Sequence, residues 1–118
     1  MTARAAISSG GKMREDGMQL VQILLPVRDN EGRSFDREAF DTVLKELSER
    51  FGGSTAYTRS PAEGIWRSKS GAHLDDIIVI EVMVDALDKS WWHAYRKDLA
   101  QRFRQKELVI RAQSIELL

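Results

Sequence analysis

The chain has 118 residues, of which 42% are hydrophobic and 31% charged, a balance typical of one small globular domain. Lys and Arg number 18, as do Asp and Glu, and the resulting zero net charge argues against nucleic acid as the main partner. The chain contains no cysteine, which excludes disulfides, thiolate metal sites and cysteine nucleophiles. No apolar run approaches the roughly 18 residues that cross a membrane, so we expect a cytoplasmic protein with no membrane partner.

The N-terminal stretch differs in composition from the remainder of the chain. Residues 1–17 contain the flexible sequence Ser8 to Gly11 and lack a hydrophobic segment of signal-peptide length. We therefore expect residues 1–17 to be a disordered tail and residues 18–118 to form a single domain.

The first two predicted elements are a strand and a helix. Met18–Val27 alternates between two faces, as a strand does. A helix begins after Asp36, which can cap it, and ends at Gly52. Glu46 and Arg50 are spaced as a surface ion pair on this helix. Its apolar residues recur at helical spacing: Phe40, Val43, Leu44, Leu47 and Phe51.

The middle of the chain predicts two strands joined by a long connection. Ser54–Arg59 reads as a short strand, followed by a turn at 60–64, a possible return strand at Ile65–Trp66 and a polar loop at 67–74. Asp75–Asp85 alternates most clearly. One of its faces carries Ile78, Ile80, Val82 and Val84, and the other carries Ile77, Val79, Glu81 and Met83.

A second helix and a last strand complete the domain. Asp88 can cap the helix, and Asp98 and Arg102 are spaced as an ion pair along it. Trp92, Tyr95, Leu99 and Phe103 form its apolar stripe, and Glu107–Leu117 alternates as the last strand.

This order of elements predicts an α+β fold. Two β-α-β halves with right-handed crossovers give the ferredoxin-like βαββαβ two-layer sandwich. We expect an antiparallel sheet with both helices on one face, the first and third strands at its centre and the other two at its edges.

Three stretches of the chain resemble a group of small bacterial hypothetical proteins. They are Arg28–Phe40, Glu49–Trp66 and Trp91–Leu118, and the resemblance spans roughly Leu20 to Leu118. It implies a bacterial origin. The group has no assigned activity, so the resemblance supplies no catalytic residues.

The sheet face turned away from the helices combines polar and apolar residues. Strand alternation places Gln22, Glu81, Arg111 and Gln113 on it, and Tyr57 can join them from the edge. We predict a polar patch at these positions, with Glu81 and Arg111 as a satisfied polar pair if a second copy of the chain covers the face. The apolar residues around the patch are Leu20, Leu24, Ile77, Val79 and Met83.

Such a face is too apolar to lie bare in water, so something should cover it. The favoured reading is a homodimer whose interface uses Leu20, Leu24, Ile77, Val79, Met83 and Trp91. The alternative is a small-molecule pocket between the face and its cover, with Glu81 as acid, base or anchor. A different partner protein, or the chain's own tail or loops, could also provide the cover.

The remaining candidates for chemistry are weaker. His73 lies beside two aspartates, but one histidine with adjacent carboxylates suits a solvated loop better than a metal site. The cations of the second helix suit a solvated face, and the strands lack the aromatic pair that reads RNA. The glycines match neither a P-loop nor a dinucleotide motif.

The sequence therefore favours a non-enzymatic, self-associating binding or assembly module. We expect no catalytic residue, no metal and no cofactor. The alternative is a small-molecule enzyme of the dimeric α+β barrel type, with Gln22, Tyr57, Glu81, Arg111 and Gln113 lining a pocket on the open sheet face.

Overall fold

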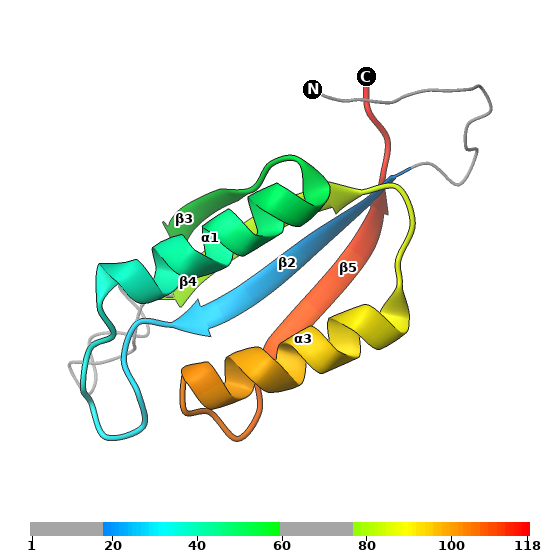
Figure 1. Ribbon diagram of the computed structural model, residues 1–118. Helices are drawn as coiled ribbons and strands as arrows, with labels where there is room; N and C mark the ends of the chain where they lie inside the picture. Colours follow the sequence, from blue (N-terminus) through cyan, green and yellow to red (C-terminus); the bar gives the residue numbers. More distant parts are fainter. Residues whose placement is uncertain (1–17, 60–76) are drawn as a thin grey trace, which may run out of the picture.

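The computed structural model describes residues 18–59 and 77–118. They form a four-stranded antiparallel sheet with two helices packed on one face (Figure 1). The expected α+β two-layer sandwich is thereby confirmed at this level. The predicted tail at 1–17 lies outside the described residues, as do the turn at 60–64, the return strand at Ile65–Trp66 and the loop that contains His73.

The elements follow the predicted order along the chain. They are β2 (Met18–Pro26), α1 (Arg37–Phe51), β3 (Thr55–Arg59), β4 (Ile77–Val84), α3 (Lys89–Arg102) and β5 (Val109–Ile115). Across the sheet the order is β3-β4-β2-β5, which puts β2 and β4 at the centre. The last strand is shorter at both ends than the predicted Glu107–Leu117. Within the described ranges no helix is long and apolar enough to cross a membrane.

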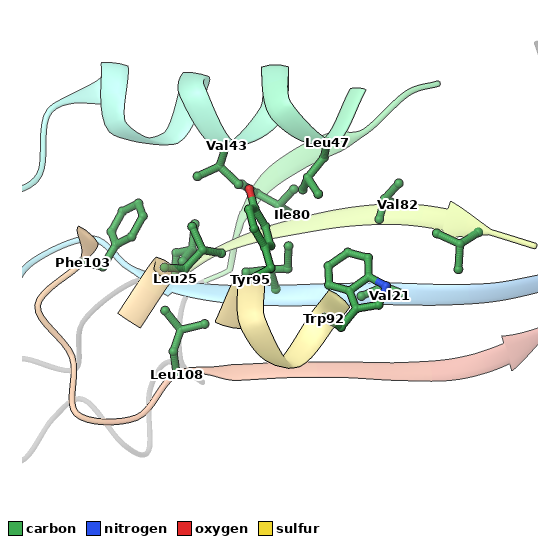
Figure 2. Close-up of a cluster of buried hydrophobic side chains, with 13 residues drawn as sticks. Val21, Leu25, Val43, Leu47, Ile80, Val82, Trp92, Tyr95, Phe103 and Leu108 are labelled. Carbon is green, nitrogen blue, oxygen red and sulfur yellow. The ribbon is translucent and has the colours of Figure 1, made fainter. Parts of the chain in front are cut away.

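The core fills the space between the helices and one face of the sheet. Val21, Ile23 and Leu25 of β2 point into it at 1% exposure or less, because every second residue of a strand shares a face. From β4, Ile80 and Val82 join them. Figure 2 shows the side chains of both helices closing over this layer, and the most buried helical residues are Val43, Leu47 and Leu99.

The helix ends are set by local chemistry that the sequence predicts in part. The Asp88 carboxylate accepts a hydrogen bond from the Trp91 N–H at 3.2 Å, which caps α3 as expected. Gly52 ends α1 in the left-handed region at φ 89°, where glycine is favoured. Asp36 occupies the cap position of α1, but its side chain makes no capping hydrogen bond.

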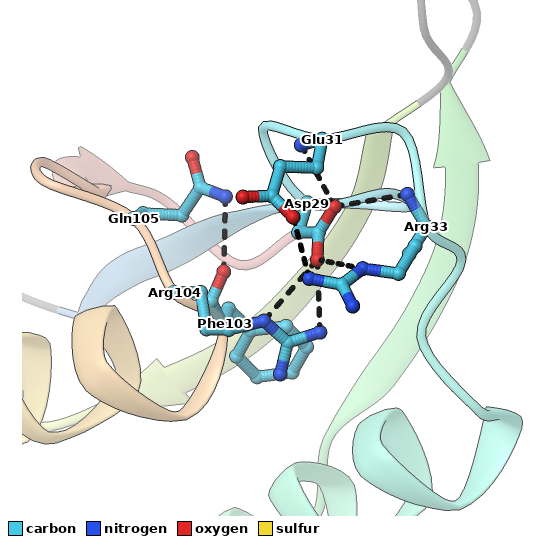
Figure 3. Close-up of polar contacts among 6 residues, drawn as sticks. All are labelled: Asp29, Glu31, Arg33, Phe103, Arg104 and Gln105. Atoms are coloured by element: carbon cyan, nitrogen blue, oxygen red, sulfur yellow. Dashed lines mark hydrogen bonds and ion pairs between the residues drawn. The ribbon is translucent and has the colours of Figure 1, made fainter.

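A buried carboxylate fixes one end of the sandwich (Figure 3). The side chain of Asp29 is 3% exposed and accepts the backbone N–H groups of Glu31 and Arg33, each at 2.9 Å. Arg104 donates to its other oxygen from Nε and Nη2 at 3.2 and 3.1 Å. The Arg33 N–H, above all, holds the pKa of Asp29 below its ordinary value, against the opposing effect of burial. This clamp joins the loop after β2 to the turn after α3.

Candidate functional site

Each of the four strands contributes at least one polar side chain to the open face of the sheet. In the strand register Gln22 of β2 pairs with Glu81 of β4 on one side and with Arg111 of β5 on the other. Tyr57 of β3 pairs with Val79, two residues from Glu81, so its ring reaches Glu81 along the diagonal. We call Tyr57, Glu81, Gln22 and Arg111 the polar row.

The polar row is a continuous chain of hydrogen bonds. The Tyr57 hydroxyl donates to Glu81 Oε2 at 2.9 Å, and the Gln22 side-chain amide donates to the same oxygen at 2.7 Å. Arg111 Nε donates to Gln22 Oε1 at 2.9 Å. Four of the five polar residues predicted for this face are thus connected.

Glu81 and Arg111 make no direct contact with each other among these hydrogen bonds. Gln22 separates them, because β2 lies between β4 and β5. Both donors to Glu81 bind Oε2, and no donor in residues 18–59 or 77–118 reaches Oε1. Glu81 is half-buried and pairs with no described cation. Within the described residues, one oxygen of this carboxylate therefore has no hydrogen-bond donor.

The other residues predicted for the open face differ in exposure. Gln113 is exposed and lies opposite Leu20 in the strand register, two pairs away from the polar row. Met83 is 48% exposed, whereas Leu20, Leu24 and Ile77 are half-buried. Val79 is fully buried within the chain, with Leu24 and Tyr57 on either side of it in the strand register. It cannot offer the contact surface that the sequence assigned to it.

Trp91, the last predicted interface residue, lies in the helical layer and not on the open face. Its ring stacks on Tyr95 with centroids 4.8 Å apart and an interplanar angle of 18°. The Arg50 guanidinium lies 4.3 Å from the centroid of the same ring. Trp91 is half-buried in this cluster between α1 and α3.

A second polar network ties the two helices together. Glu46 of α1 accepts the Tyr95 hydroxyl at 2.8 Å and Arg102 Nη2 at 2.9 and 3.0 Å. Arg102 also donates to Asp98 at 2.8 Å, which confirms that predicted pair. Burial, together with the bond to Glu46, raises the pKa of Tyr95 well above its usual range. We call these four residues the helix network.

No group of three or more potential metal-ligating side chains occurs within the described ranges. His93 is exposed on α3, and His73 lies outside the described residues. On the open face, the polar row offers the Glu81 carboxylate, its neutral donors and the Arg111 guanidinium.

Comparison with known proteins shows a similarity to solved structures. No protein-family model and no curated protein matches the chain. A phage SAM lyase in complex with S-methyl-5'-thioadenosine has a similar fold, with a TM-score of 0.55 and 14% sequence identity. The match covers 90% of this chain and 88% of the lyase.

This finding corrects the functional expectation drawn from the sequence. The non-enzymatic binding or assembly module was the favoured reading, yet the structure that shares the fold over nearly its whole length is an enzyme holding a small molecule. The alternative, a small-molecule enzyme, agrees better with this neighbour.

Proposed function

We propose that this chain is an enzyme that cleaves S-adenosylmethionine at the open sheet face, with the polar row as its site. The observation that carries the proposal is the separation of charge in that row. Glu81 and Arg111 lie on the same face, but each is bonded to Gln22 and neither neutralises the other. The fold neighbour supplies the substrate class to be tested.

The charges of the substrate complement this arrangement. S-adenosylmethionine carries a sulfonium and an ammonium cation, and its amino-acid part ends in a carboxylate. A cation facing Glu81 Oε1 and a carboxylate facing Arg111 would each find an opposite charge, strengthened where the site is partly dry. The half-buried Leu20 and Leu24 offer apolar surface for the adenine ring.

The reaction balances without an added reagent. The bond between the sulfonium sulfur and the γ-carbon of the amino-acid part breaks, and its electron pair stays on sulfur, giving neutral S-methyl-5'-thioadenosine. The carbon regains electrons from within the substrate, in one of two ways. Either the substrate carboxylate closes on the γ-carbon to form a lactone, or a β-proton passes to Glu81 and a double bond forms. Glu81 is a counter-charge in the first route and a general base in the second.

Two structural statements belong to the same proposal. We propose that the sandwich is a ferredoxin-like plait, since its second, third, first and fourth strands in chain order lie side by side. We also propose a homodimer in which a second copy covers the open face, because exposed Met83 beside half-buried leucines leaves apolar surface there. Light scattering coupled to size exclusion tests the dimer, and a monomer at every concentration would refute it.

The activity test is direct. Purified protein is incubated with S-adenosylmethionine, and S-methyl-5'-thioadenosine and the second product are quantified by mass spectrometry. We expect turnover by the wild type, and a loss of about 100-fold in kcat for Glu81→Gln, which removes the charge and keeps the shape. Identification of a lactone or of an unsaturated amino acid separates the two routes.

Glu116→Gln is the matched control. This substitution removes the same charge as Glu81→Gln, but at an exposed residue outside the polar row. Circular dichroism verifies that both variants are folded. A wild type that forms no more product than a protein-free sample, or a Glu81→Gln variant as fast as the wild type, contradicts the proposal.

A further inference from the structure

A groove lies on the helix side of the sheet, between α3 and the edge strand β5. Its volume is about 330 Å³, within the range of roughly 300–1,000 Å³ that is usual for small-molecule pockets. Trp92, Leu87 and Ile110 give it apolar surface, and Lys89, His93 and Arg96 line it from α3. No Asp or Glu is among its lining residues.

The cations of this groove differ from four arginines elsewhere in the described ranges that pair with carboxylates. Arg33, Arg37, Arg102 and Arg104 each lie within 4 Å of a carboxylate. Lys89 and Arg96 form no ion pair or hydrogen bond with any carboxylate that the structure describes.

Arg96 is also half-buried, and no carboxylate within residues 18–59 or 77–118 pairs with it. In a chain of zero net charge, two such cations facing one groove form a local excess of positive charge.

We propose that this groove binds a small organic anion, a carboxylate or phosphate carried on an apolar body. Lys89 and Arg96 pair with the charge, and Trp92, Leu87 and Ile110 contact the body. A second copy of the chain fits less well, because two-fold pairing of this surface would bring the same cations together. The inference is independent of the proposed lyase activity.

The test uses three probes of nearly the same size: phenyl phosphate, benzoate and the neutral benzyl alcohol. Each is titrated into isotopically labelled protein, and amide shifts at His93 and Ala112, which line the groove, are followed by NMR. We expect saturable shifts with one or both anions and none with the alcohol. A phosphate preference indicates a phosphorylated ligand, and a benzoate preference indicates a carboxylic acid.

Charge-matched variants localise the binding. We expect Lys89→Ala combined with Arg96→Ala to raise the Kd at least about tenfold, and Lys97→Ala combined with Lys106→Ala to leave it within about twofold. Lys97 and Lys106 are exposed and lie outside the groove lining. Arg111 also borders the groove, but it belongs to the polar row and is left unchanged.

Three outcomes overturn the proposal: no saturable shifts with either anion, equal binding of benzyl alcohol, or equal loss of affinity in the two double variants. Should the Lys89 and Arg96 variant fail to fold, the wild type still decides the question. Binding through these cations must weaken as salt is raised, and binding that ignores salt refutes it.

Discussion

The helix network and the polar row share three residue types, a glutamate, a tyrosine and an arginine, and differ in the fourth residue, Asp98 or Gln22. In both, the tyrosine hydroxyl donates to the glutamate, at 2.8 Å for Tyr95 and 2.9 Å for Tyr57. They differ in the arginine. Arg102 binds Glu46 directly and Asp98 as well, whereas Arg111 reaches Glu81 only through Gln22.

This difference separates a structural contact from a candidate site. A direct ion pair satisfies both charges within the protein and leaves little for a ligand to gain. In the polar row the charges are held apart by a neutral amide, so both remain able to bind an external group. Substitutions in the helix network should therefore affect stability, and those in the polar row should affect activity.

The largest difference in stability is expected between alanine substitutions of Arg102 and Arg111. Arg102→Ala should lower the free energy of unfolding by about 1–2 kcal/mol, because it leaves Glu46 and Asp98 facing each other without a cation. Their side chains are 39% and 52% exposed, and solvent screening keeps the loss from being larger. Arg111→Ala should change stability by less than about 0.5 kcal/mol but weaken substrate binding. Urea unfolding measures the stability of both variants, and steady-state kinetics measures their substrate binding. Equal losses of stability would contradict the distinction between the helix network and the polar row.

A smaller effect is expected at Tyr95. Tyr95→Phe removes one hydrogen bond to Glu46 and should cost about 1 kcal/mol at neutral pH. Tyr57→Phe should leave stability nearly unchanged, because the Tyr57 side chain is 42% exposed on the open face. Thermal unfolding of the two variants side by side decides between these expectations. The comparison fails if Tyr57→Phe proves the more destabilising.

The smallest effect is a change in alkaline stability. Burial and the bond to Glu46 raise the pKa of Tyr95 in the folded protein, whereas in the unfolded chain the hydroxyl ionises near pH 10. Above that pH the unfolded state binds fewer protons than the folded state, so the stabilisation from Tyr95 is present below pH 10 and declines as the pH rises.

The expected result is a free energy of unfolding that falls less steeply above pH 10 in Tyr95→Phe than in the wild type. Urea unfolding at a series of pH values measures both slopes. Identical slopes would show that Tyr95 titrates in the folded protein as it does in the unfolded chain.

The membership of the open face could be predicted because strand alternation leaves few choices. Once Ile80 and Val82 face the helices, Glu81 must face away, and the same rule assigns Gln22. The hydrogen-bond partners of these residues were harder to predict from the sequence. Strand alternation did not show that Gln22, on the strand between them, would link Glu81 to Arg111 within one chain.

The helix network illustrates a different limit. Helical spacing predicted Arg50 as the partner of Glu46, but Glu46 turns to Tyr95 and Arg102 of the other helix, while Arg50 lies over Trp91. Spacing rules describe neighbours on one helix and contain no information on how two helices dock. For the same reason, the sequence could not identify which cations of α3 would lack a carboxylate, or that Asp29 would be clamped by Arg104.

The order of the strands also determines when the polar row can form. Gln22 is 59 residues from Glu81 and 89 residues from Arg111 along the chain, yet it bonds to both. Closing loops of this length is entropically costly and slows folding, so the central strand β2 must wait for partners synthesised much later. A nascent chain that has not yet released β5 from the ribosome has a central strand with an unpaired edge and an incomplete row. The polar row is therefore complete only after β5 has emerged and paired with β2.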